Sequence, residues 1–168
     1  MNQASDLKIE GHGDREIVFS RSFNAPRELV YEAMMNPDLV KRWLGVFGGW
    51  TMAECHIDPR VGGTYRYVWH GPNNARMAMG GVFREIKPNE RWVQTEKFDD
   101  PWYEGEAVGT ATLTEKDGRT YYRAVQVYTS REVRDAVLKS PMESGVNKSY
   151  LALDQVLATM PSRTVATR

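Results

Sequence analysis

Residues 16–45 read EIVFSRSFNAPRELVYEAMMNPDLVKRWLG, and this stretch decides the fold. Apolar and polar side chains alternate over Glu16–Phe23, as they do in a strand with one buried face. Two helix starts follow, at residues 24–26 and 36–37, where an Asn that can cap a helix stands before a Pro in the first turn. Gly45 is suited to end the second helix. The sequence therefore predicts a strand followed at once by two short helices.

Further strands are expected from residue 51 to residue 129, where β-rich runs alternate with turn residues. The six expected strands span residues 51–57, 64–70, 77–86, 91–98, 107–114 and 120–129. Asp117-Gly118, between the last two, is a typical hairpin turn. Connections as short as these favour an antiparallel meander over parallel βαβ units.

Two helical segments end the pattern, one capped by Ser130 and a longer one over residues 142–160. An apolar stripe at helical spacing marks the long helix, and it consists of Val146, Tyr150, Leu153, Leu157 and Met160. Such a stripe must cover an apolar surface, and the sheet offers the only large one. The predicted fold class is α+β, with a curved antiparallel sheet of about seven strands wrapped around one long C-terminal helix.

The domain is expected to span residues 16–160, which is enough chain for one proper core. Residues 1–15 are predicted to be a flexible lead-in and residues 161–168 a flexible tail.

Composition narrows the range of partners. The 22 Lys and Arg residues balance the 22 Asp and Glu residues, so no basic excess favours nucleic acid. The sequence contains no run of about 18 apolar residues, so no membrane span is predicted. The N-terminus has no apolar run typical of a signal peptide. Cys55 is the only cysteine, so no internal disulfide can form, which suits a reducing cytoplasm. We therefore expect a cytoplasmic protein that binds neither nucleic acid nor membrane.

Five motifs, in this order along the chain, carry a resemblance to a known family. They are RSFNAPRELVY at residues 21–31, NPDLVKRW at 36–43, DPRVGG at 58–63, SREVRDAVL at 130–138 and MESG at 142–145. Together they resemble the SRPBCC or START-like superfamily, also called the helix-grip or birch-pollen-allergen fold. Within it the chain is most similar to the activator of heat-shock protein 90 ATPase homologue-like proteins, over roughly residues 16–160. The resemblance implies the helix-grip fold, but the motifs are structural, and members include ligand binders, cyclases and co-chaperone domains.

A bent sheet around a single helix rarely fills its own interior, so we expect a cavity between them. The small residues Ala107, Gly109 and Ala111 on one strand face would leave room for it. The expected pocket lining is Trp43, Phe47, Tyr67, Trp69, Trp92, Tyr128, Met142, Val146, Tyr150 and Leu153. The polar side chains that could anchor a ligand carboxylate or carbonyl, if they face inward, are Arg66, Arg84, Arg123 and Gln126. Alternatively, the same aromatic side chains could pack against one another in a core without a cavity.

One other cluster invites a chemical interpretation. Strand alternation places Glu54 and His56 on one face and Cys55 on the other, so the first two could form an acid–base pair or an exposed ion pair. His56 and His70 could be cross-strand neighbours and bind zinc together with Glu54. Since no metal-ligand spacing is present, we expect no metal site, no cofactor and no assigned catalytic residue.

Three functions remain open from the sequence. The first is a binding protein for a small apolar or lipid-like molecule, which is more in keeping with the sequence than an enzyme. The second is a cyclase or aromatase-like enzyme, which a buried ionisable group with a shifted pKa would favour. The third is a co-chaperone-like module that stimulates a chaperone ATPase, which a large exposed apolar patch would favour. Extra aromatic side chains on the convex sheet face could also pair two copies into a homodimer.

Overall fold

The strands predicted by alternation form one antiparallel sheet in this computed structural model, which describes residues 5–161. The eight strands are β1 Lys8–His12, β2 Glu16–Phe23, β3 Thr51–Ile57, β4 Thr64–His70, β5 Arg76–Lys87, β6 Arg91–Phe98, β7 Ala107–Lys116 and β8 Arg119–Val127. Their order across the sheet is β1-β2-β8-β7-β6-β5-β4-β3. The helices are α1 Arg27–Met35, α2 Pro37–Val40, the 3-10 turn η1 Pro72–Asn74, α3 Arg131–Lys139 and α4 Met142–Thr159. The α+β prediction is confirmed.

Strand β1 corrects the expectation that residues 1–15 are a flexible lead-in. It pairs antiparallel with β2, from Lys8 opposite Ser20 to His12 opposite Glu16. The buried guanidinium of Arg134 on α3 donates to the backbone carbonyls of His12 and Glu16, at 3.2 and 2.8 Å, and so fixes the end of this hairpin. Residues 162–168 of the expected tail lie outside the described residues.

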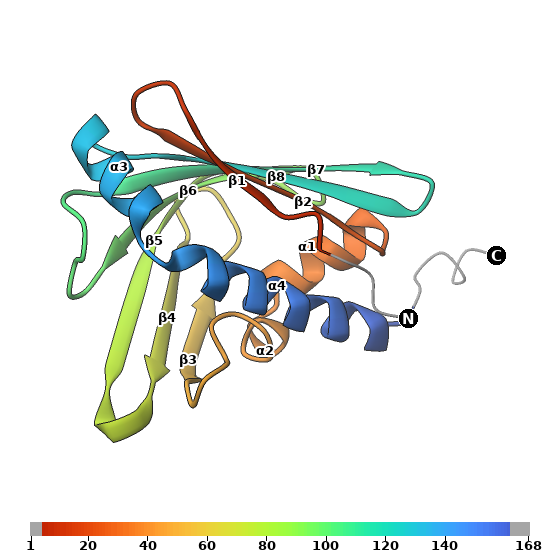
Figure 1. Cartoon of the computed structure of the whole chain (residues 1–168). Coiled ribbons are helices and arrows are strands. Elements are labelled where there is room, and N and C mark those ends of the chain that lie inside the picture. The colour runs from red at the N-terminus through yellow and green to blue at the C-terminus, as the bar shows by residue number, and fades with distance from the viewer. Residues whose placement is uncertain (1–4, 162–168) are drawn as a thin grey trace.

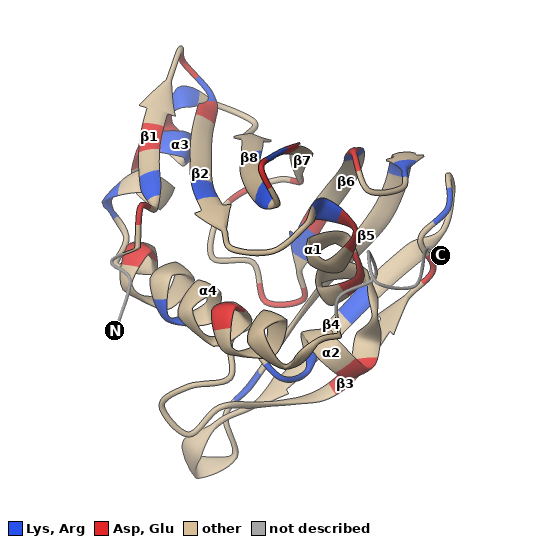
Figure 2. Cartoon of the chain, turned by 90° about the vertical axis from the view of Figure 1, so that its right-hand side faces the viewer, with Lys and Arg blue, Asp and Glu red and all other residues tan. Residues whose placement is uncertain are grey.

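The sheet bends around α4, as Figure 1 shows. Strands β1, β2, β8 and β7 lie across one side of the helix, and β5, β4 and β3 turn away at a steep angle, so the helix lies between the two parts of the sheet. The inner face of α4 buries Tyr150, Leu153 and Leu157, three members of the predicted stripe. The predicted long helix over an antiparallel sheet is therefore confirmed. Charged residues of both signs are spread along strands and helices rather than gathered in one region (Figure 2).

Helices α1 and α2 close one end of the bent sheet. The Asn36 side chain accepts a hydrogen bond from the backbone amide of Asp38 and caps α2, as the sequence predicted. Trp43, just beyond α2, is 5% exposed, and its indole Nε1 donates to the carbonyl of Ala33 at 3.0 Å. The expected burial of Trp43 is thus confirmed, and the indole nitrogen has the partner that a buried Trp requires.

Two apolar clusters fill the interior of the described chain. The larger lies between the sheet, α1, α2 and α4, while the smaller joins Ile17 and Val137 to Tyr103 and Tyr128 near α3. Among residues 5–161 no helix combines the length and the apolar character needed to cross a membrane.

Candidate functional site: a cavity with one buried carboxyl

A cavity of about 270 Å³ lies within the larger cluster, between the sheet and the helices. Its apolar wall consists of Phe19, Met34, Met35, Val40, Trp43, Leu44, Tyr67, Trp69, Met79, Phe83, Trp92, Gly109, Ala111, Tyr122, Ala124, Val146 and Tyr150. The remaining lining residues, Gln94, Glu96, Thr110 and Gln126, add polar groups. This volume lies just under the ~300–1,000 Å³ usual for small-molecule sites.

The register of β6, β7 and β8 explains why space is left. Trp92 lies opposite Ala111, which lies opposite Ala124, so one large ring stands beside two small side chains. In the next inward row, Gly109 separates Gln94 from Gln126. The small residues Gly109 and Ala111 of β7 therefore leave space between the larger side chains of β6 and β8. This agrees with the role expected for them.

Gly109 also admits the side chain of Gln126. A Cβ at residue 109 would overlap with Oε1 of Gln126, so the carboxamide oxygen lies directly over this glycine. The amide group of Gln126 then interacts with the carboxyl of Glu96, which follows Gln94 on the same inward face of β6.

Glu96 is the central polar group of the cavity. Its Oε2 accepts a hydrogen bond of 2.6 Å from the hydroxyl of Tyr103, and the carboxamide of Gln126 is a second polar neighbour. Burial raises the pKa of the Glu96 carboxyl above its usual range, and Tyr103 and Gln126 oppose the rise without cancelling it. The side chain is partly buried and lines the cavity.

Buried phenols surround this carboxyl. Burial raises the pKa of Tyr67 and of Tyr122, and the charge of Glu96 adds to both shifts, so both hydroxyls are neutral near pH 7. The hydroxyl of Tyr150 donates to that of Tyr122 at 3.3 Å. The site thus combines aromatic surface, neutral donors and one carboxyl.

The lining contains no basic side chain. Among its described residues none is Lys, Arg or His, and Glu96 is the only carboxyl. Arg21, opposite Tyr122 on the neighbouring strand β2, is 5% exposed and pairs with both oxygens of Asp154 at 2.7 and 2.6 Å. Its charge is therefore already matched by a partner on α4.

The structure brings six of the ten expected lining residues to the cavity wall: Trp43, Tyr67, Trp69, Trp92, Val146 and Tyr150. The other four lie elsewhere. Leu153 is fully buried in the larger cluster, and Phe47 packs beside Gly145 with the Lys148 ammonium 5.3 Å from its ring centre. Tyr128 and Met142 belong to the smaller cluster with Tyr103.

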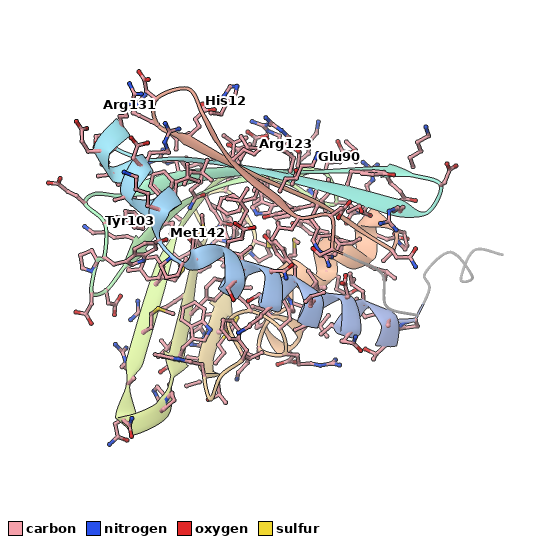
Figure 3. All side chains as sticks on the ribbon, viewed as in Figure 1. His12, Glu90, Tyr103, Arg123, Arg131 and Met142 are labelled. Carbon is pink, nitrogen blue, oxygen red and sulfur yellow. The ribbon has the colours of Figure 1, made fainter. Side chains whose placement is uncertain are left out.

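One of the four expected polar anchors, Gln126, faces the cavity. Arg66 forms a two-pronged ion pair with Asp99 on the outside, and Arg84 pairs with Glu106 at 3.8 Å. Arg123 projects from the side of the sheet that faces away from α4 (Figure 3). None of the three arginines can reach a ligand in the cavity.

Glu54 and His56 form an exposed ion pair, which was the alternative to an acid–base pair in the sequence analysis. Glu54 Oε1 and His56 Nε2 lie 3.7 Å apart with both side chains largely exposed. His56 lies opposite Arg66 and His70 opposite Thr51, so the two histidines are not neighbours as the zinc hypothesis required. Burial raises the pKa of the Cys55 thiol to about 11, which suits a packing role. Within residues 5–161 no group of three or more metal-binding side chains converges.

Glu96 is the functional candidate that sequence reasoning missed. A signal was available, because Glu96 is four residues beyond Trp92 on the same strand and must share its face. Tyr103 could not have been found in this way, since it lies in the connection between β6 and β7. Figure 3 shows it at the end of the molecule where α4 begins, near Met142.

A second, more open depression lies outside the cavity. It is lined by Trp50, Arg76, Met77, Ala78, Asp100, Trp102, Ser140, Pro141 and Met142. It brings together Met77 and Trp102, two of the large apolar side chains that are exposed.

Comparison with known proteins agrees with this architecture. The family model described as Activator of Hsp90 ATPase homolog 1-like protein matches residues 24–158. A crystal structure from Rhodobacter sphaeroides is similar over 92% of this chain and 99% of its own, with 31% identity and a TM-score of 0.86. One from Chromobacterium violaceum shares 28% identity over 87% of this chain and 99% of its own, with a TM-score of 0.72. No curated protein matches the chain.

Proposed function

Because this chain belongs to the Activator of Hsp90 ATPase homolog 1-like family of the SRPBCC superfamily, we propose that it binds a small, largely apolar molecule in the internal cavity. The observation that carries the proposal is the wall itself, where rings and methionines surround about 270 Å³ of space. A ligand that fills such a space removes apolar surface from water and gains packing contacts. The volume suits a compound of one or two rings better than a long acyl chain.

The test is a thermal-shift measurement with a panel of small aromatic and aliphatic compounds. A ligand present at 100 times its Kd stabilises the native state by about 2.7 kcal/mol, which raises the melting temperature by several degrees. Val146→Trp should fill the cavity from α4 and abolish the shift. Leu151→Trp is the matched control, because Leu151 lies on the same helix but is 40% exposed.

The proposal fails if no compound shifts the wild-type protein, or if the Val146 and Leu151 variants respond alike. Native mass spectrometry of the purified protein provides an independent measurement, because a co-purified ligand would reveal its mass directly.

Glu96 favours a second candidate, an acid–base catalyst of the cyclase type. A carboxyl whose pKa is raised by burial keeps its proton at a pH where an ordinary Glu has lost it, and can act as a general acid. Native mass spectrometry separates the candidates. The Glu96→Gln variant of a binding protein should carry the wild-type ligand, or less of it, and no species of new mass, whereas an enzyme whose acid is removed should retain a substrate that differs in mass from the wild-type ligand.

A further inference from the structure

We propose that the cavity selects ligands that carry a protonated amine, with the ammonium beside the carboxyl of Glu96 and the apolar body between the aromatic rings. The inference rests on the proposed function, since it names the chemistry of the ligand for the same cavity. Its two supports, the charge of the lining and its aromatic character, are separate observations.

The first support is an acidic group with no basic partner in the lining. Glu96 is the only carboxyl among the described lining residues, and no basic side chain accompanies it there. Its neighbours Tyr103 and Gln126 are neutral donors. An ionised carboxylate has about four acceptor positions, so the hydrogen bond from Tyr103 and the nearby amide of Gln126 leave capacity for a further donor from the cavity. A buried charge without a counter-ion is costly, and a ligand cation would supply the missing partner.

The second support is the aromatic wall of the same cavity. Three tryptophans, Trp43, Trp69 and Trp92, line the cavity together with Tyr67 and Tyr122. The charge of Glu96 reaches the last two, because it contributes to the raised pKa of both phenols after the effect of burial. Faces of aromatic rings attract cations, and the attraction increases when the cation is removed from water. A carboxyl and rings that converge on one space are therefore complementary to an ammonium group.

The same arrangement disfavours other ligand classes. A ligand carboxylate would meet the charge of Glu96 with no Arg or Lys in the lining to balance it. A neutral alcohol of the same shape would gain the ring contacts and one hydrogen bond, but no ion pair. Charge-assisted hydrogen bonds are about twice as strong as neutral ones, so the amine should bind best of the three.

The experiment compares 3-phenylpropylamine, 3-phenylpropanol and 3-phenylpropionate, which share one ring and a similar length. Isothermal titration at pH 7 should give a Kd for the amine at least about tenfold below that of the alcohol, with the carboxylate weakest. Glu96→Gln keeps the shape of the side chain but removes its charge, and should bring the amine and alcohol within about threefold of each other. Glu54→Gln removes one exposed carboxylate of the outer surface and should keep the wild-type order.

Each outcome bears on one of the two proposals. If the alcohol binds as tightly as the amine or more tightly, the cavity binds small molecules and the amine inference is overturned. If Glu96→Gln keeps the preference for the amine, the cation lies elsewhere and the inference is also overturned. If neither these compounds nor the apolar panel bind the wild-type protein, the proposed function itself is wrong. The wild-type comparison decides the matter even if the Glu96 variant does not fold.

Discussion

The hydroxyl of Tyr103 donates a 2.6 Å hydrogen bond to Oε2 of Glu96, and this contact joins the two interior clusters of the protein. Tyr103 packs edge-on against Tyr128 in the smaller cluster, with ring centres 5.3 Å apart. Glu96 lies at the cavity in the larger one. The connection between β6 and β7 therefore positions the carboxyl from outside the cavity wall.

The stability of the protein should depend on pH through Glu96. Burial raises the pKa of the folded carboxyl above 4.5, so the folded state binds its proton more tightly than the unfolded chain. This contribution is fully present below about pH 4.5 and is lost as the pH rises through the folded pKa. Urea unfolding across pH 4–8 should therefore show Glu96→Gln gaining stability relative to wild type as the pH rises. A constant difference between the two proteins would contradict the raised pKa.

Tyr103→Phe should raise the pKa of Glu96 further. The phenol hydrogen bond favours the ionised carboxylate, so its loss leaves burial less opposed. A titration of the Glu96 carboxyl carbon followed by NMR would measure the change directly. Tyr121→Phe, at an exposed phenol on β8, is the control and should leave the Glu96 titration unchanged.

Sequence alternation predicted seven of the strands because their rings and branched side chains repeat every second residue. It missed β1, whose KIEGH segment holds one branched apolar residue and a glycine. This strand is held by pairing with β2 and by Arg134, whose position on α3 no local pattern reveals.

The sequence also predicted part of the candidate site. Rings on inward strand positions were found because a strand has only two faces. Tyr128 and Met142 were misplaced because they lie where the chain passes from β8 to α4, beyond the part of the sheet that surrounds the cavity. Glu96 was missed because a carboxylate on a strand is usually exposed, and because its hydrogen-bond donor is Tyr103, which is not on a strand.

Trp43→Ala should destabilise the protein by about 3–5 kcal/mol, the usual cost of removing a large buried ring. The substitution opens a void beside α2 and leaves the carbonyl of Ala33 without its indole donor. Trp102→Ala is the matched control, since Trp102 is 50% exposed and should change stability by no more than about 0.5–1 kcal/mol. Equal midpoints for the two variants in urea would show that Trp43 does not support the core.

Asp154→Asn should also be destabilising, because it leaves the guanidinium of Arg21 buried without a full counter-charge. The cost should be about 2 kcal/mol, between that of an exposed pair and that of a fully buried one, since the carboxylate is partly exposed. Asp99→Asn is the control, because Asp99 forms the same two-pronged ion pair with Arg66 on the outer surface. This substitution should lower stability much less. If the two variants unfold at the same urea concentration, the burial of Arg21 does not increase the contribution of its ion pair to the free energy of unfolding.

Gly109→Ala should disturb the polar end of the cavity through Gln126. The new methyl would overlap with Oε1 of Gln126, so the carboxamide must swing away and lose its contact with Glu96. We therefore expect weaker ligand binding and a further rise in the pKa of Glu96, because a polar neighbour that favours the carboxylate is displaced.

A double-mutant cycle with Gln126→Ala isolates this cause. Once the Gln126 side chain is absent, Gly109→Ala meets no obstacle, and its effects on binding and on the Glu96 titration should vanish. It should then even stabilise the fold by up to about 1 kcal/mol, because alanine is better than glycine inside a strand. If Gly109→Ala weakens binding equally in both backgrounds, the methyl acts by narrowing the cavity, and Gly109 does not serve to position Gln126.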